Sequence, residues 1–270
     1  SRGLGDVYKR QDDDWYDKHR ITLHKAAKIV EIDRERQTVI SENEITASYD
    51  QLVIATGSDP IVIPLPGHDL TGVLTYRDLD DVEAMLEAAR TQKRAIVIGG
   101  GLLGLEAAAG LKMQGMDVTV LHLANTLMER QLDETAGHLL QEALEALGIG
   151  IITQADTRAI TGQDGYVTGV TLENGIFLAA DIVCMAVGIR PNTQLAAQAG
   201  LAVNRGILAG DDLRTSDPRI FTLGECAEHN GECYGLVAPL YEMANVIAEN
   251  LTGKEACLLY TSDAADEEDS

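Results

Sequence analysis

A glycine-rich segment near the middle of the chain constrains the fold more than any other feature. Residues 94–123 read RAIVIGGGLLGLEAAAGLKMQGMDVTVLHL. The apolar run 95–98 predicts a buried strand, and the stretch that ends near Gly115 predicts a helix. Residues 117–123 then predict a second strand. A strand, a helix and a second strand in this order predict a parallel β-α-β unit.

Three glycines lie at the turn between the first predicted strand and the helix. Gly99, Gly101 and Gly104 fit the pattern GxGxxG. Glycine permits the tight turn and the close approach of a pyrophosphate, and the helix N-terminus offers unpaired N–H groups to that anion. The pattern alone is weak, but strand, turn, helix and strand all fall in the expected order here. We therefore predict a dinucleotide-binding site and regard a glycine-rich turn without a ligand as the weaker alternative.

The residue at the end of the second predicted strand often selects the nucleotide. An acidic residue there hydrogen-bonds the ribose of NAD, whereas a nearby arginine accommodates the 2′-phosphate of NADP. This chain has His122 at that position, and Arg130 is the nearest arginine downstream. We favour a histidine in the core or on the surface over a nucleotide-binding residue at this position, so the choice between NADH and NADPH stays open.

Strand and helix patterns alternate along the rest of the chain, which predicts an α/β fold. Residues 28–41 and 44–56 are expected to form short strands, whereas the proline-rich 60–67 is expected to be a connector. Apolar residues at helical spacing predict a helix near 82–89. Further expected elements are a helix over 136–147, short strands with DG and NG turns over 157–188, and a last helix within 236–253.

The two ends of the sequence differ from the rest and are related through nucleic acid. Asp6–Gln11 reads DVYKRQ and Cys257–Ser262 reads CLLYTS. One short DNA element read on opposite strands can encode both segments. We therefore expect residues 1–11 and 257–270 to be translated sequencing-adapter sequence around a fragment, and we exclude them from the fold prediction.

Composition and charge restrict the partners. The net charge is −22, which argues against nucleic acid or an anionic membrane surface as a partner. No apolar run approaches the roughly 20 residues that are needed to cross a bilayer. Cys184, Cys226 and Cys233 form no CxxC pair, and the histidines have no ligand spacing, so no metal site is predicted. The surroundings of Cys184, DIVCMAV, are typical of a buried strand.

Four motifs follow one another along the chain: YDQLVIATG (49–57), GGGLLGLEAA (99–108), AVGIRPN (186–192) and TSDPRIFTLGE (215–225). Motifs of these kinds in this order resemble the family of FAD-dependent pyridine nucleotide-disulfide oxidoreductases. The resemblance implies an α/β two-dinucleotide-binding-domain flavoprotein fold. It places pieces of a truncated FAD domain at 12–80 and 208–256, with a Rossmann-like NAD(P) domain inserted at 81–207.

Three further features narrow the resemblance: NTLMERQLDETAG (125–137), YGLVAP (234–239), and Glu225 in a GEC sequence where most relatives have Asp. They resemble the large subunit of the NAD(P)H nitrite reductases within that family. The resemblance implies FAD and NAD(P)H as cofactors of a cytoplasmic oxidoreductase. Iron–sulfur and sirohaem centres would lie in downstream electron-acceptor domains, and a small subunit or a homodimer would complete the assembly.

The resemblance also implies the cofactor-binding residues, and it implies no catalytic side chain in this segment. Residues near FAD would be Thr56, Gly57, Gly224, Glu225, Ala238 and Pro239. Residues near the nucleotide would be Gly99, Gly101, Gly104, Glu106, His122 and Gly188. The family's first GxGxxG is absent from this chain, so we expect the fragment alone to bind FAD poorly.

Several alternatives remain open. A rubredoxin or ferredoxin reductase, an NADH oxidase and a CoA-disulfide reductase have the same fold. The thioredoxin reductase type is disfavoured because residues 93–180 contain no cysteine. A non-catalytic NAD(P)-binding module is the alternative from a different class of function, and it predicts nucleotide binding without flavin reduction.

Overall fold

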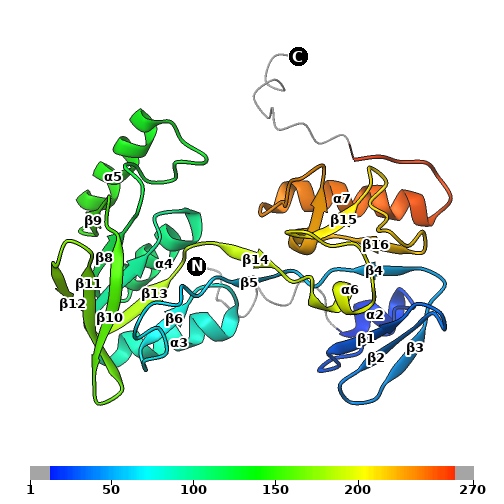
Figure 1. The fold of residues 1–270 in the computed structure, drawn as a ribbon, viewed down its shortest axis with the longest axis horizontal. Helices are drawn as coiled ribbons and strands as arrows, with labels where there is room; N and C mark the ends of the chain where they lie inside the picture. Colours follow the sequence, from blue (N-terminus) through cyan, green and yellow to red (C-terminus); the bar gives the residue numbers. More distant parts are fainter. Residues whose placement is uncertain (1–12, 259–270) are drawn as a thin grey trace. The chain divides into compact units, whose positions relative to one another are not determined.

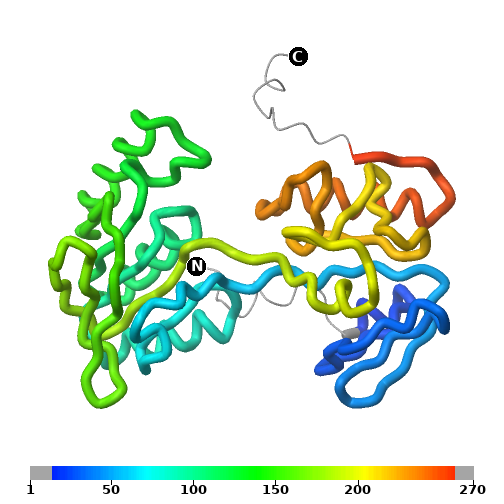
Figure 2. The backbone as a smooth tube through the Cα atoms, in the orientation of Figure 1, coloured from blue at the N-terminus to red at the C-terminus, as the bar shows by residue number. Residues whose placement is uncertain are grey.

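The structure is a computed structural model that describes residues 13–258, and its chain separates into two compact units (Figure 1). The first unit contains the described residues up to Thr56 and those from Asn192 onward. The inserted unit is the continuous segment Gly57–Pro191. The division into units lies at 56/57 and 191/192. The resemblance implied domain boundaries at 80/81 and 207/208, and that assignment of cofactor domains stays a prediction. The path of the chain can be followed in Figure 2, where it leaves the first unit once and returns once.

A five-stranded parallel sheet forms the centre of the inserted unit. Its order is β6-β13-β7-β8-β9, with every neighbouring pair parallel. The strands are β6 (Val73–Thr75), β7 (Arg94–Ile98), β8 (Asp117–Leu121), β9 (Gly150–Ile152) and β13 (Ile182–Met185). The helices are α3 (Leu79–Thr91), α4 (Leu102–Met113) and α5 (Glu134–Ala146). The expected parallel β-α-β arrangement is therefore present.

Both faces of the parallel sheet are covered, which explains its near-continuous apolar strands. Ala95 and Val97 on β7 pack in a cluster with residues of the helices. Ile96 and Ile98 face the opposite way and pack in a cluster with a three-stranded antiparallel sheet. That sheet consists of β10 (Thr157–Gln163), β11 (Tyr166–Leu172) and β12 (Phe177–Ala179). The inserted unit therefore has three layers: helices, parallel sheet and antiparallel sheet.

Two short strands carry the chain into and out of the inserted unit. β5 (Ser58–Pro60) pairs antiparallel with β14 (Ile189–Pro191), so that Ser58 lies opposite Pro191. The remaining residues of the proline-rich connector, 61–67, form no strand.

The first unit is built from small sheets around two apolar clusters. Its strands are β1 (Ile29–Asp33), β2 (Thr38–Ser41), β3 (Thr46–Ser48), β4 (Leu52–Ile54), β15 (Ile207–Ala209), β16 (Ile220–Thr222) and β17 (Ala227–His229). β1, β2 and β3 form an antiparallel sheet, whereas the pairs β4-β16 and β15-β17 are parallel. The helices are α2 (Asp13–Lys18), α6 (Gln194–Gln198), the 3₁₀ turn η1 (Gly224–Cys226) and α7 (Val237–Leu251).

Successive residues of β16 pack in different apolar clusters of the first unit. Ile220 packs in a cluster with Ile54, whereas Phe221 packs in a cluster with Met243 of α7. All three residues of β16 are buried, and this burial positions the turn at residue 224 that follows the strand. Among residues 13–258, no helix combines the length and the apolar character that a membrane span requires.

Candidate nucleotide-binding and flavin-binding site

The glycine-rich turn lies at the carboxyl edge of the central strand of the parallel sheet. β7 has β13 on one side and β8 on the other: the chain runs from β7 through β8 to β9 and later returns to β13, on the opposite side of β7. In open α/β sheets, ligands bind at this point, where the strand order reverses. The turn at Gly99–Gly101 is therefore at the position where the topology predicts a ligand.

Two of the glycines are required by the packing of the protein itself. Gly99 has a φ of +123°, and a Cβ atom there would lie 2.2 Å from the carbonyl oxygen of Ala186. A Cβ atom on Gly104 would lie 2.0 Å from the carbonyl oxygen of Gly99. These glycines allow the strand, turn and helix to approach one another closely.

Gly101 has no such internal reason to be glycine. Its φ of −84° is accessible to any residue, and a Cβ atom there would have no neighbour within 4 Å. Gly101 is also the N-cap of α4, and no side chain caps this helix. The first N–H groups of α4 are therefore not covered by a side chain of residue 101. The open space in front of them fits the pyrophosphate of a dinucleotide.

His122 lies beneath the glycine-rich turn. The backbone N–H of Gly100 donates to His122 Nδ1 at 3.1 Å, so Nδ1 carries no proton. The remaining ring proton is on Nε2, which lies 3.0 Å from Glu129 Oε2. A Cβ atom on Gly100 would lie 2.7 Å from His122 Cγ, so the ring packs directly against the turn. Residue 122 is thus a buried core residue, and β8 ends at Leu121 instead of continuing to residue 123.

The remaining residues predicted to lie near the nucleotide are in the same unit. Glu106 is exposed on the second turn of α4, and the buried face of that helix includes Leu105 and Ala108. Gly188 has a φ of +117° and accepts a hydrogen bond from the N–H of Ile61 at 3.0 Å, so it shapes the start of the return crossing. The roles of these residues toward a nucleotide stay predictions.

Thr56 and Gly57 lie where the chain leaves the first unit. Thr56 Oγ1 donates to the backbone carbonyl of Asn192 at 2.7 Å, and Asn192 is the residue at which the chain returns. Gly57 has a φ of +65° with open space around its Cβ position, and this conformation favours glycine. The structure therefore gives Thr56 a structural contact in addition to its predicted place near the flavin.

The other residues predicted to lie near the flavin follow β16. Gly224 has a φ of +88° with open space around its Cβ position, and Glu225 is half-buried in η1. The turn is held by the N–H of Leu223, which donates to the carbonyl of Ile54 at 2.9 Å. α7 begins at Val237, so Ala238 and Pro239 lie in its first turn, where proline is tolerated. No side chain caps α7, which leaves N–H groups at this end for an electron-rich group.

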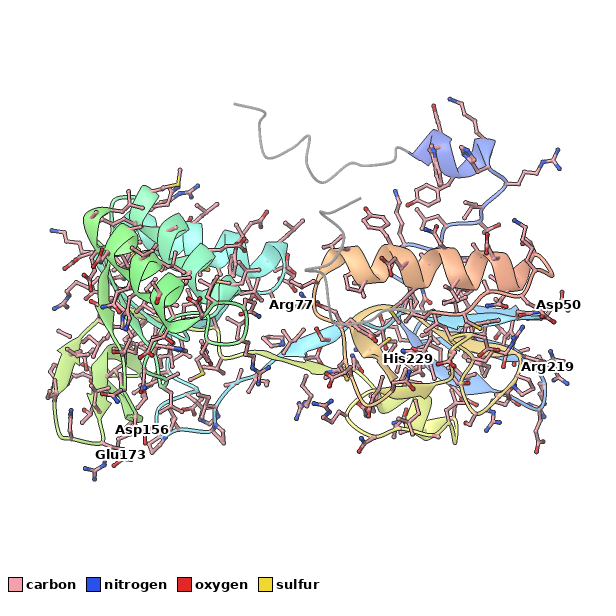
Figure 3. All side chains as sticks on the ribbon, turned by 90° about the horizontal axis from the view of Figure 1, so that it is seen from above. Asp50, Arg77, Asp156, Glu173, Arg219 and His229 are labelled. Atoms are coloured by element: carbon pink, nitrogen blue, oxygen red, sulfur yellow. The ribbon has the colours of Figure 1, made fainter. Side chains whose placement is uncertain are left out.

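A buried histidine on β17 was not recognised from the sequence. His229 is 2% exposed, and its Nε2 lies 2.8 Å from Asp211 Oδ1 (Figure 3 labels His229). The hydrogen bond from His229 lowers the pKa of Asp211. Among the described residues, no group of three His, Cys, Asp or Glu side chains could hold a metal ion.

Comparison with protein families identifies the chain. Residues 8–246 match the family of pyridine nucleotide-disulphide oxidoreductases. The chain belongs to this family. The resemblance that the four motifs indicated is thereby confirmed, and it covers most of the chain.

Nitrite reductases are among the relatives of this pyridine nucleotide-disulphide oxidoreductase. The chain is 50% identical over 244 residues to a nitrite reductase [NAD(P)H] of Bacillus subtilis, covering 90% of this chain and 30% of that protein. It is 47% identical over 240 residues to an assimilatory nitrate reductase electron transfer subunit of the same organism, covering 89% of this chain and 31% of that protein. The chain thus spans about a third of the length of these relatives, and the closer resemblance to nitrite reductases is confirmed.

Solved structures of reductases confirm the fold. A ferredoxin reductase from Rhodopseudomonas palustris superimposes with a TM-score of 0.86 at 30% identity, covering 92% of this chain and 63% of that one. The two-dinucleotide-binding flavoprotein fold expected from the motifs is therefore correct. A ferredoxin reductase of the same fold also keeps that alternative open for the electron acceptor.

Proposed function

We propose that this chain is the electron-input module of a nitrite reductase that is driven by NAD(P)H. In this proposal the inserted unit binds NAD(P)H, and the first unit contributes to an FAD site. The observation that carries the proposal is the glycine-rich turn, where Gly101 leaves open space in front of an uncapped helix. The nitrite reductase of Bacillus subtilis, at 50% identity, supports the choice of acceptor.

The inserted unit provides three features that suit a dinucleotide. Gly99 and Gly104 hold the turn close to α4, and Gly101 leaves room for a pyrophosphate. The N–H groups at the start of α4 offer hydrogen bonds and the positive end of a helix dipole to that anion. These groups bind and orient the nucleotide, and none of them needs to transfer a proton.

The first unit provides a second uncapped helix. The start of α7, with Ala238 and Pro239, and the turn at Gly224 and Glu225 are the groups that we propose for contact with FAD. Helix N-terminal N–H groups stabilise an electron-rich ring system or an anionic group. When bound, FAD and the nicotinamide together supply hydride transfer and the release of single electrons to later centres.

Electrons would then pass to iron–sulfur and sirohaem centres in further domains, and the reaction would take place in the cytoplasm. A small subunit or a second copy of the chain would complete the assembly. A second candidate function is a stand-alone reductase of a small electron carrier. This candidate has a specific basis, because the relatives include a nitric oxide reductase FlRd-NAD(+) reductase of Aeromonas hydrophila at 36% identity.

The test uses the purified holoprotein with its bound flavin. We expect flavin absorbance to bleach on anaerobic mixing with NADH or NADPH, and to return on addition of nitrite. Bleaching that a small iron–sulfur carrier reverses and nitrite does not would favour the second candidate. Nucleotide binding without any bleaching would contradict both and would identify a non-catalytic module.

A further inference from the structure

The carboxylate that commonly recognises the ribose of NADH is missing at the end of β8. His122 has that position, and its ring is buried under the glycine-rich turn instead of facing a ligand. Both ring nitrogens are engaged, Nδ1 with Gly100 and Nε2 with Glu129. His122 itself is therefore not available to bind a ribose hydroxyl.

A different carboxylate is brought to the same edge of the sheet. The backbone N–H of Met128 donates to the carbonyl of Gly100 at 3.0 Å, which holds the segment before Glu129 against the glycine-rich turn. Leu127 is fully buried, and its Cδ2 would lie 2.7 Å from a Cβ atom on Gly100. The backbone at Glu129 is thus held next to the glycine-rich turn.

The side chain of Glu129 is oriented by the histidine. Its Oε2 lies 3.0 Å from His122 Nε2, while 44% of the side chain remains exposed. Because Gly100 N–H binds the other side of the same ring, a single imidazole separates the carboxylate from the turn. The carboxylate therefore has one oxygen held by His122 and retains the capacity to accept a hydrogen bond from a ligand.

The neighbouring charges leave Glu129 as the oriented group at this edge. Asp133 uses its carboxylate to cap α5 by accepting from the N–H of Ala136 at 2.7 Å, and Glu134 lies in the first turn of that helix. Arg130 is exposed and makes no ion pair within residues 13–258. Arg130 is the side chain that could instead favour a 2′-phosphate.

We propose that Glu129 selects NADH over NADPH, with His122 as the residue that positions it. The carboxylate would accept a hydrogen bond from the 2′-hydroxyl of the adenosine ribose. It would repel the 2′-phosphate of NADPH, because a phosphate monoester carries nearly two negative charges at neutral pH. The inference rests on the proposed binding of NAD(P)H to the inserted unit and adds the basis of its selectivity.

The first experiment measures binding of NADH and NADPH by isothermal titration calorimetry, so the readout does not depend on turnover. We expect the unmodified chain to bind NADH at least about tenfold more tightly than NADPH. Glu129→Gln keeps an oxygen that accepts from His122 Nε2 but removes the charge, so we expect the ratio of the two Kd values to fall to near one. Arg130→Gln is the matched control on the adjacent residue, and it should leave NADH binding and the preference for NADH unchanged.

The second variant separates positioning from folding. His122→Phe keeps the volume of the ring and removes both hydrogen bonds. A structural effect alone would weaken the binding of NADH and NADPH by the same factor and leave their ratio unchanged. A positioning role predicts that the ratio itself falls, in a protein whose circular dichroism spectrum matches that of the unmodified chain.

Some results would overturn the inference. Equal affinity of the unmodified chain for NADH and NADPH would overturn it and leave the proposed function standing. A Kd ratio that is insensitive to Glu129→Gln, or one that changes in Arg130→Gln instead, would do the same. Failure of the folded chain to bind either nucleotide would overturn the proposed nucleotide site together with this inference.

Discussion

Asp181 accepts hydrogen bonds from both the backbone and the side chain of Arg94, at the start of two adjacent parallel strands. Asp181 Oδ2 accepts from the N–H of Arg94 at 2.9 Å, and Oδ1 accepts from Arg94 Nη2 at 2.6 Å. The N–H of Lys93 donates to the same carboxylate at 3.1 Å. The carboxylate therefore joins the amino ends of β13 and β7, opposite the edge that carries the glycine-rich turn.

Replacing this carboxylate should destabilise the inserted unit in a way that depends on pH. The hydrogen bond from the Arg94 side chain lowers the pKa of Asp181 from 3.8 to about 2. We expect Asp181→Asn to lower the free energy of unfolding by about 1 to 2 kcal/mol at pH 7, a range reduced for the exposure of Arg94. Urea unfolding followed by circular dichroism measures this difference.

The pH dependence of that difference follows from the sign of the pKa shift. Because the pKa in the folded state lies below its ordinary value, the stabilisation is fully present above about pH 5 and is lost as the pH falls toward 2. The two proteins should therefore converge in stability between about pH 4 and pH 2. A difference that stays constant over this range would show that the carboxylate charge contributes nothing.

Gly101→Ala should impair nucleotide binding without affecting the fold. The residue has ordinary backbone angles and open space around its Cβ position, so the cost to stability should be only about 0.5 to 1 kcal/mol, the difference between glycine and alanine at an N-cap. The added methyl group would occupy the space proposed for the pyrophosphate, and we expect the Kd for NADH to rise by about tenfold or more. Calorimetric titration together with a thermal melt tests both parts, and unchanged affinity would contradict the proposed site.

Gly99→Ala is the matched comparison, and it should act mainly on stability. Alanine is strained at a φ of +123°, and its Cβ would lie 2.2 Å from the carbonyl oxygen of Ala186. We expect a loss of about 2 to 4 kcal/mol in the free energy of unfolding. A variant that melts at the temperature of the unmodified protein would show that the turn can rearrange.

Cys184 should be inert toward thiol reagents in the folded protein. Burial in β13 raises the pKa of its thiol to about 12, and the nearby charge of Asp81 adds to the shift. Because the thiolate is the reactive species, its fraction at pH 8 is about one in ten thousand. Maleimide labelling with peptide mapping should modify the exposed Cys257 and leave Cys184 unmodified until denaturant is added. Modification of both at similar rates in the native state would contradict this prediction.

The sequence predicted the elements whose pattern is local. The apolar run at 95–98, the turn at Gly99 and the helix that follows are all determined by neighbouring residues, and the structure has each of them. The burial of Cys184 was also confirmed, because a run of apolar residues in a parallel sheet is covered on both faces.

The contacts that orient the site could not be predicted in the same way. His122 has the position of a ribose-binding residue, and its ring turns inward because the N–H of Gly100, twenty-two positions earlier, supplies a donor. The partner of Arg94 is eighty-seven positions away. Such pairs depend on which strands become neighbours, and no local periodicity encodes that order.

The insertion of one unit within the other has a consequence for the order of folding during synthesis. β4 pairs with β16, and the whole segment Gly57–Pro191 is translated between them. The inserted unit is continuous, so a ribosome releases all of it before β16 emerges. Until then β4 lacks this partner, and Ile54 lacks the neighbours Ile207 and Ile220 of its buried cluster. The early strands of the first unit therefore cannot complete their sheet or bury their apolar side chains until the inserted unit has been synthesised. During that time their apolar surface is accessible to chaperones.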